Sequence, residues 1–352
     1  MSTSIKPLVS VIMPVFDERE SIQHCLRSVL GQVTDGFELE VLVVDGNSAD
    51  GTAELVAAIA AGDDRVRLIH NPVRKTPVAF NLGLHAARGE YVCILGAHTV
   101  YPPDYISVCL QELRRRGATG CSGRIVTVPA ENTLQARLSA WTFGSSFASS
   151  PNSVRTRIEG FADTIPYPVF QKEPLLEVGG YDEALERNQD NDMNQRLRAR
   201  GYRLYLTSRT KCQYRARPTL AALWKYAFRT GWWNGISLRH KPASMSLRHL
   251  VPSLFVLTLL GLIGIGLLSQ LVTGQFASGA ITALLLVLGA HLAVGIAAAC
   301  TTAARDRAFE PLLLPPVFLV FHIAYGLGAL VGITTKMEGV QAAQAPQLKT
   351  EG

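Results

Sequence analysis

The sequence has little charge, and three long stretches of it carry none. Charged residues make up 18% of the 352 residues, and residues 250–268, 280–299 and 312–333 contain no Asp, Glu, Lys or Arg. Each stretch is close to the ~20 apolar residues that a helix needs to cross the hydrocarbon layer of a bilayer. This excludes an ordinary soluble protein and predicts three transmembrane helices. A transporter is disfavoured, because His291 and His322 are the only ionisable residues inside them.

Several sequence signals of other protein classes are missing. The six cysteines form no C-x-x-C pair, which excludes a zinc signature and a disulfide framework. No helix-turn-helix, zinc finger or interleaved basic and aromatic motif is present, so we expect no nucleic-acid partner. The apolar run at residues 8–13 is too short for a signal-peptide core and ends at Pro14, so we expect a strand there and a cytoplasmic location for the domain that contains it.

The net charge of +6 arises partly from basic residues that flank the apolar stretches. They stand before the first stretch and after the second, at Arg239, Lys241, Arg248, Arg305 and Arg307. The loop between the first two stretches, residues 269–278, has no Lys or Arg. Because basic residues favour the cytoplasmic side of a membrane, we expect the N-terminal domain in the cytoplasm, at the inner membrane, and the C-terminus outside.

Aromatic and basic residues alternate just ahead of the first apolar stretch. Residues 220–238 include Trp224, Trp232 and Trp233 together with Lys225 and Arg229. This mixture is typical of a helix that lies in the headgroup region of a membrane. An ordinary amphipathic core helix is the alternative.

The N-terminal part alternates short apolar runs with segments of helical periodicity. Strands are predicted at residues 8–13, 39–44, 66–69 and 91–95, and helices at residues 21–30, 52–61 and 77–87. This order predicts a mostly parallel α/β sheet. Loops that follow parallel strands share one edge of the sheet, so we expect Glu18, Asp45 and His98 to approach one cleft. Asp50 is interpreted as a turn or helix-capping residue.

Four segments resemble the successive motifs of family-2 glycosyltransferases. They read VSVIMPVFDERESI, VLVVDGNSADGT, NPVRKTPVAFNLGLHAARGEYVCILGAH and GGYDEAL…NQDNDMNQRLRARGYRL, in the order of that family. The similarity is greatest to the bacterial membrane-anchored enzymes of exopolysaccharide synthesis, the succinoglycan-type subset. The resemblance covers about residues 9–206.

This resemblance implies a Rossmann-like GT-A fold and inverting transfer from a nucleotide-sugar, UDP-linked by our interpretation. It implies donor-binding roles for Pro14, Glu18, Asp45, Arg74, Asn81 and Ala97. It implies acceptor-binding roles for Gly180, Tyr181 and Asp182. Asp190 occupies the place of the catalytic base, and a helix N-cap is the alternative. Asp192 is either an acceptor-binding residue or a complement to the helix dipole.

Two residues depart from the family pattern. Gly96 stands where the metal-binding D-x-D motif has its first Asp, and Gln189 stands where a Glu usually precedes the base. His98 remains as a candidate ligand for a divalent cation, Mn²⁺ or Mg²⁺, although a hydrogen-bonding role is an equal alternative. The requirement for a cation is therefore left open.

The expected organisation has four parts. Residues 1–215 form the cytoplasmic GT-A domain, 216–248 an interfacial segment, 249–336 three transmembrane helices and 337–352 a tail. The expected reaction moves one sugar onto a polyprenyl-diphosphate-linked saccharide. Single transfer is favoured because FRTGWW does not fit the Q-x-x-R-W motif of processive synthases. The alternatives are a polyprenyl-phosphate sugar synthase and a non-catalytic membrane scaffold with the same fold.

Overall fold

The computed structural model describes residues 6–97, 99–185 and 187–335. The chain divides into two compact units. The sheet unit comprises Met1–Val126 and Arg157–Tyr214, and the helical unit comprises Thr127–Thr156 and Arg215–Gly352. The chain passes from one unit to the other after residues 126, 156 and 214.

In the described part of the sheet unit, eight strands form one sheet in the order β3-β2-β1-β4-β7-β5-β8-β6. The strands are β1 (Leu8–Val15), β2 (Glu38–Asp45), β3 (Val66–His70), β4 (Tyr91–Ile94), β5 (Gly120–Val128), β6 (Gly160–Phe161), β7 (Val169–Gln171) and β8 (Leu204–Arg215). β1 is parallel to β2 and β4, and β2 is parallel to β3, whereas β7 is antiparallel to β4 and β5. The mostly parallel GT-A-like fold is confirmed.

Helices connect these strands. They are α1 (Arg19–Leu30), α2 (Thr52–Gly62), α3 (Thr76–Ala86), α4 (Tyr105–Arg116), α7 (Lys172–Glu177) and α8 (Gln189–Ala199). One core cluster joins Ile12 and Leu42 of the sheet to Phe80 of α3 and Met193 of α8. The central strands are apolar on both faces because helices cover a parallel sheet on both sides.

The parallel strand register places the loops expected at the site on one edge of the sheet. Val15, the last residue of β1, is paired with Asp45, the last residue of β2. Ile12 is paired with Ile94, the last residue of β4. The loops that follow β1, β2 and β4 therefore leave the sheet at its same edge.

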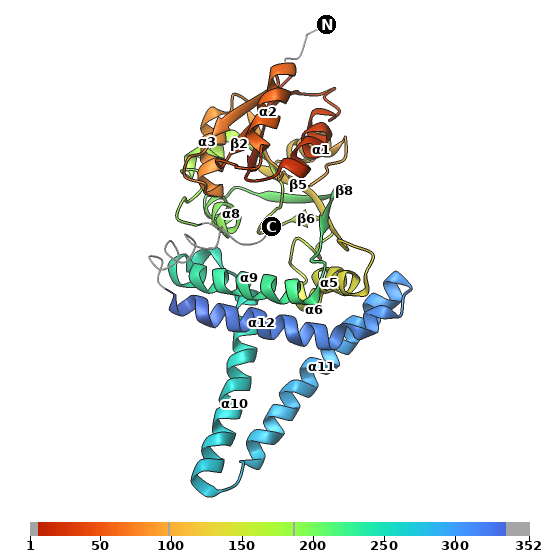
Figure 1. The fold of residues 1–352 in the computed structure, drawn as a ribbon, viewed down its shortest axis with the longest axis vertical. Coiled ribbons are helices and arrows are strands. Elements are labelled where there is room, and N and C mark those ends of the chain that lie inside the picture. The colour runs from red at the N-terminus through yellow and green to blue at the C-terminus, as the bar shows by residue number, and fades with distance from the viewer. Residues whose placement is uncertain (1–5, 98, 186, 336–352) are drawn as a thin grey trace. The chain divides into compact units, whose positions relative to one another are not determined.

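The helical unit contains the long apolar helices. Its helices are α5 (Leu134–Gly144), α6 (Ser146–Ser149), α9 (Leu220–His240), α10 (Val251–Thr273), α11 (Ser278–Asp306) and α12 (Leu314–Thr334). The three predicted apolar segments correspond to α10, α11 and α12, which are long and apolar enough to cross a membrane. α10 and α11 form a long hairpin, and α12 lies beside α9 (Figure 1).

α9 and α12 approach each other at backbone distance. A Cβ atom on Gly231 or Gly235 of α9 would overlap backbone atoms of Tyr325 or Ala329. A Cβ atom on Gly328 or Gly332 of α12 would overlap the backbone carbonyl of Phe228 or Trp232. Small residues permit this separation, which is typical of helix pairs in membrane proteins.

We predict that Gly231→Ala lowers the midpoint of thermal unfolding of the detergent-solubilised protein. The added methyl group overlaps the Tyr325 carbonyl and forces α9 away from α12, and such overpacking costs about 1–3 kcal/mol. Gly264→Ala in α10 is the matched control, since no atom lies within 4 Å of its Cβ position. Equal midpoints for the two variants would contradict the close packing.

Candidate functional site

Asp45 ends β2 as a buried carboxylate that organises the loop after it. Its Oδ1 accepts a hydrogen bond from Ser48 Oγ at 2.6 Å, and its Oδ2 accepts one from Ser48 N at 3.1 Å. Ser48 Oγ in turn accepts the backbone N–H of Asp17 at 2.9 Å. The loop after β2 is therefore bonded to the loop after β1.

A second set of bonds joins the same two loops. Asp17 Oδ1 accepts the N–H of Ala49 at 2.8 Å, and Asp50 Oδ2 accepts the N–H of Arg19 at 3.0 Å. Asp50 Oδ1 also accepts the N–H of Thr52 at 2.9 Å, at the start of α2. The interpretation of Asp50 as a turn or capping residue is confirmed. These bonds hold Asp17 at a positive φ of 50°.

Pro14, Glu18 and Arg74 lie along this edge. Pro14 is in β1, opposite Val44. Glu18 is the residue before α1, and its carboxylate accepts a hydrogen bond from the Ser21 hydroxyl. The guanidinium of Arg74 lies 5.9 Å from the centre of the Phe16 ring, in the loop after β1. The structure therefore brings Arg74 to the Asp45 edge.

Asn81 is bonded to the Gly180–Glu183 segment. Its Nδ2 donates to the Tyr181 carbonyl at 2.9 Å and to Glu183 Oε1 at 2.8 Å. Its Oδ1 accepts the Tyr181 N–H at 2.7 Å. Gly180 has a φ of 69°, and a Cβ atom there would lie 2.7 Å from Asn81 Oδ1. Asn81 therefore holds the backbone of this segment, a role that the sequence analysis missed.

The loop after β4 contains Gly96 and Ala97, where the sequence resemblance predicts a metal motif. Ala97 is buried, and the Gly96 N–H and the Tyr101 hydroxyl lie 2.8 Å apart. A Cβ atom on Gly96 would meet Tyr167 Cε1 at 3.6 Å, an ordinary contact, so a Cβ atom is tolerated there. His98 lies outside the described residues. Within the described ranges, no three His, Cys, Asp or Glu side chains are grouped as metal ligands.

Asp190 lies in the first turn of α8 and follows Asn188, which has a positive φ of 61°. Its Oδ1 accepts the N–H of Asn191 at 2.8 Å. Surrounding protein atoms displace water from the carboxylate and raise its pKa, although part of the residue remains exposed to solvent. Burial raises the pKa of the Tyr181 hydroxyl, and the charge of Asp190 raises this pKa further.

Asp192 differs from Asp190 in its surroundings. It is 2% exposed and pairs with Arg196 Nε at 2.8 Å. Arg196 Nη1 also donates to the Val178 carbonyl at 2.6 Å, just before the Gly179-Gly180 turn. Asp182 accepts the N–H of Ala184 at 3.0 Å. These contacts link α8 to the turn that carries Gly180 and Tyr181.

The sheet unit therefore contains an acidic residue, Asp190, whose pKa is raised, and a hydrogen-bonded polar edge beside Asp45. A carboxylate accepts up to four hydrogen bonds, so Asp45 retains acceptor capacity beside its two bonds to Ser48. The sequence analysis missed Asp17 and Ser48. A signal for them was available, because an Asp three residues ahead of a Ser commonly forms a side-chain turn of this kind.

Comparison with known proteins finds a family model and two relatives that are similar to parts of this chain. Residues 10–173 match the family model described as "Glycosyl transferase family 2". The succinoglycan biosynthesis protein ExoA of Rhizobium meliloti (strain 1021) is 29% identical over 220 residues, which cover 61% of this chain and 66% of that protein.

A second relative shares a larger part of the chain. It is the dolichyl N-acetyl-alpha-D-glucosaminyl phosphate 3-beta-D-2,3-diacetamido-2,3-dideoxy-beta-D-glucuronosyltransferase of Methanococcus voltae. It is 24% identical over 267 residues, which cover 74% of this chain and 82% of that protein. Among solved structures, the mannosyltransferase PcManGT from Pyrobaculum calidifontis, in complex with GDP-Man and Mn²⁺, superposes with a TM-score of 0.57. The alignment covers 94% of this chain and 88% of that one at 21% identity, and supports the fold alone.

We predict that Asn81→Asp loosens the Gly180–Glu183 segment. The substitution places a carboxylate oxygen against the Tyr181 carbonyl and the Glu183 carboxylate, and the loss of such bonds costs about 1–3 kcal/mol. Hydrogen exchange measured by mass spectrometry should show faster exchange in the peptide that contains Tyr181. Asn132→Asp is the control, because Asn132 uses its oxygen to accept from Arg137 and an Asp keeps that bond. Unchanged exchange at Tyr181 would contradict the role of Asn81.

Proposed function

We propose that the chain is a family-2 glycosyltransferase, as the match of residues 10–173 supports, and that it transfers one sugar, with inversion, from a UDP-sugar to a polyprenyl-diphosphate-linked saccharide. The observation that carries the proposal is the position of Asp190, an exposed residue in the first turn of α8 whose carboxylate has a pKa raised by desolvation. The acceptor class is supported by the names of the two relatives, one of succinoglycan biosynthesis and one that acts on a dolichyl-linked sugar phosphate. The helices long and apolar enough to cross a membrane agree with a lipid-linked acceptor.

In the proposed reaction Asp190 is the general base. Its carboxylate takes the proton of the acceptor hydroxyl while the hydroxyl oxygen attacks the anomeric carbon of the donor sugar. The bond from that carbon to the diphosphate breaks, and the nucleoside diphosphate leaves with the electron pair. Attack opposite to the leaving group inverts the anomeric configuration. The raised pKa makes Asp190 a stronger base than an ordinary Asp, while the Asn191 N–H keeps its carboxylate oriented.

The edge beside Asp45 is the proposed donor site. Asp45 and Glu18 accept hydrogen bonds from the ribose and the base, Pro14 lines the base, and Ala97 lies at the start of the loop after β4. Arg74 supplies positive charge near the departing diphosphate. Asn81 acts by holding the Gly180–Tyr181–Asp182 segment, which we assign to the acceptor. The catalytic unit is proposed to lie on the cytoplasmic side of the inner membrane.

A divalent cation is a separate part of the proposal. The described residues do not by themselves make a metal site, because Gly96 contributes no carboxylate and no three His, Cys, Asp or Glu side chains are grouped among them. His98, the proposed ligand, is outside the described residues. When bound, a cation would compensate the charge of the donor diphosphate. The step at Asp190 does not depend on it.

We predict that Asp190→Asn lowers the rate of sugar transfer by about 10²–10⁴, because the amide cannot accept the acceptor proton. Transfer is measured with the protein in membranes, a panel of radiolabelled nucleotide-sugars and lipid-linked acceptors. Donor affinity should stay within about twofold, since Asp45 and Arg74 are untouched. The matched control is Asp163→Asn, an exposed Asp paired with Arg198.

Four results would decide against parts of this proposal. An Asp190→Asn variant that keeps more than a tenth of the rate would exclude Asp190 as the base. Transfer to bare polyprenyl phosphate in preference to a lipid-linked saccharide would indicate a polyprenyl-phosphate sugar synthase. No turnover with any donor and acceptor would indicate a scaffold. A ladder of many added sugars would contradict single transfer.

We predict that Gly96→Asp lowers the Mn²⁺ concentration needed for half-maximal transfer by about tenfold or more, because it adds the missing hard oxygen ligand beside His98. Gly96→Ala is the control, since it fills the same space without a ligand atom. Transfer by the unaltered chain should fall when EDTA is added. Transfer that ignores EDTA in the unaltered chain and in Gly96→Asp would exclude a cation from the reaction.

A further inference from the structure

α12 follows α9 along its whole length, although it is apolar enough to cross a membrane. Near one end of the pair, Leu314 and Phe318 of α12 share a core cluster with Leu223 of α9. Near the other end, Arg239 Nη1 donates to the Ile333 carbonyl at 3.3 Å, and Trp232 Nε1 donates to Thr335 Oγ1 at 3.1 Å. The two helices therefore run side by side in the same direction, and the orientation of one in the membrane is the orientation of the other.

α9 is not a membrane-spanning helix. Lys225, Arg229 and Arg239 are exposed on it, and charged side chains are strongly unfavourable in the hydrocarbon layer. Its Trp and basic residues are typical of a helix in the interface. β8 ends at Arg215 and α9 begins at Leu220, a link too short to cross a bilayer. α9 therefore remains on the same side of the membrane as the sheet unit.

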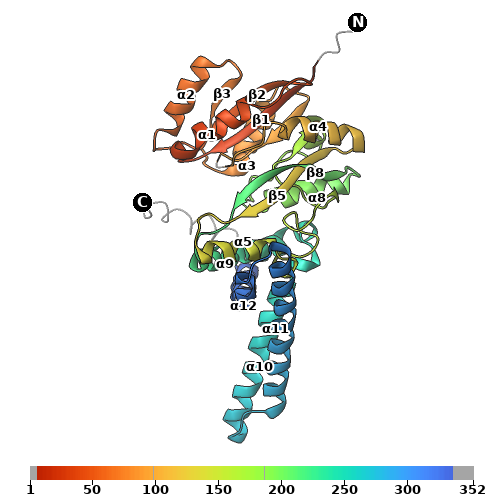
Figure 2. The same ribbon diagram turned by 90° about the vertical axis from the view of Figure 1, so that its right-hand side faces the viewer.

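The points where α12 crosses the α10–α11 hairpin both lie far from the hairpin tip. A Cβ atom on Gly326, midway along α12, would overlap Pro252 in the first turn of α10. One on Gly295 of α11 would lie 3.6 Å from Pro315 at the start of α12. At ~1.5 Å per residue these points are about 33 Å and 26 Å from the hairpin tip, close to the ~30 Å hydrocarbon thickness. α12 crosses the hairpin near its base (Figure 1), and Figure 2, turned by 90°, shows α12 nearly end-on beside the lengthwise hairpin.

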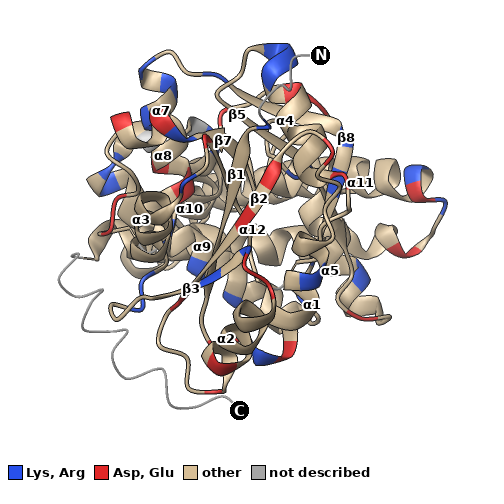
Figure 3. Ribbon diagram, turned by 90° about the horizontal axis from the view of Figure 1, so that it is seen from above, with Lys and Arg blue, Asp and Glu red and all other residues tan. Residues whose placement is uncertain are grey.

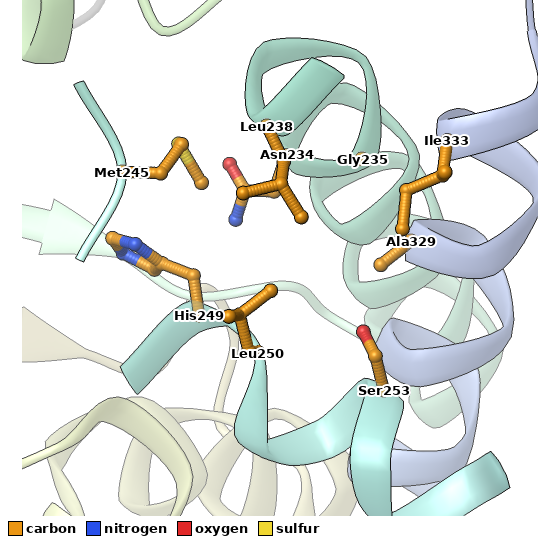
Figure 4. Close-up of a pocket in the computed structure, with 9 residues that line it drawn as sticks. All are labelled: Asn234, Gly235, Leu238, Met245, His249, Leu250, Ser253, Ala329 and Ile333. Atoms are coloured by element: carbon orange, nitrogen blue, oxygen red, sulfur yellow. The ribbon is translucent and has the colours of Figure 1, made fainter. Parts of the chain in front are cut away.

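A small cavity shows that the C-terminal end of α12 lies beside the first turn of α10. Ala329 and Ile333 line it together with Asn234 of α9, His249 and Ser253 (Figure 4). Ser253 belongs to the first turn of α10, at the base of the hairpin. If α12 crossed the bilayer, its last turns would instead lie toward the hairpin tip.

The turn between α11 and α12 is attached to α5. Asp306 Oδ2 accepts the indole N–H of Trp141 at 2.7 Å, and Glu310 pairs with Arg137 at 3.4 Å. α5 in turn shares a core cluster with α9, through Leu138 and Phe143. Figure 3 shows acidic and basic residues gathered at this end of α11. The turn therefore lies at the level of α9, and the tip of the hairpin is at the opposite side.

We propose that only α10 and α11 cross the membrane and that α12 lies in the interface with α9, on the same side of the membrane as the sheet unit. The chain then leaves α12 on that side, which differs from the expectation from charge that the C-terminus is outside. The burial of the helices supports this, since 56% of the most apolar window of α12 is buried within the protein, against 22% for α10 and 11% for α11.

Cysteine labelling tests this topology without any measurement of activity, so its outcome is independent of the proposed function. In a Cys300→Ser background, single cysteines replace Glu20 on α1, Gln275 at the hairpin tip and Phe309 between α11 and α12, and a fourth is appended after Gly352. Intact spheroplasts and inverted membrane vesicles are treated with a membrane-impermeant maleimide. Unchanged thermal unfolding midpoints show that each variant is folded.

We expect the cysteine at position 275 to react in spheroplasts alone. The cysteines at positions 20 and 309 and the appended cysteine should react in inverted vesicles alone. An appended cysteine that reacts together with position 275 would show that α12 crosses and would overturn the proposal. Reaction of position 275 together with position 20 would show that the hairpin does not cross, with the same consequence.

Discussion

The proposed donor site depends on the parallel pairing of β1 with β2 and β4. Parallel strands end at the same edge, so the pairing of Val15 with Asp45 brings two loops together that are about thirty residues apart in the sequence. The loops then bond directly, through Asp45, Ser48 and Asp17. The rigidity of this edge thus comes from short hydrogen bonds between loops and not from apolar packing. At a polar edge of this kind, the hydroxyl groups of a nucleotide can replace bound water molecules and make the same hydrogen bonds.

The segment proposed for the acceptor is held in a different way. Gly180 adopts a left-handed conformation in contact with Asn81, and Asn81 bonds both backbone groups of Tyr181. On its other side, the buried Asp192–Arg196 pair reaches the Val178 carbonyl. Asp190 therefore lies in the first turn of α8, a helix that is anchored next to the turn that contains Gly180. Of the two acidic residues in this helical turn, Asp192 is held in an ion pair, and Asp190 is the one for which we propose proton transfer.

In the helical unit, glycine residues allow α9 and α12 to pack closely. Backbone contact between α9 and α12 requires Gly231, Gly235, Gly328 and Gly332 on the facing surfaces. This contact buries apolar surface of α12 against protein. A helix that is apolar enough to cross a bilayer can therefore lie at the membrane surface, as proposed above. An interfacial layer of two helices beside a two-helix hairpin would give a lipid-linked substrate a surface along which to approach.

The fold class, the order of the first four strands and first three helices, the family resemblance and the three apolar helices could be predicted from the amino-acid sequence, because periodicity, apolar length and motif order are local properties. The sequence also placed Asp45 and Glu18 at one edge, since the parallel order of the strands implies that edge. The role of Asn81 in holding the Tyr181 backbone required the tertiary structure, because the two residues are a hundred positions apart. The packing of α12 on α9 required it too, because hydropathy measures how apolar a helix is and not whether lipid or protein covers it.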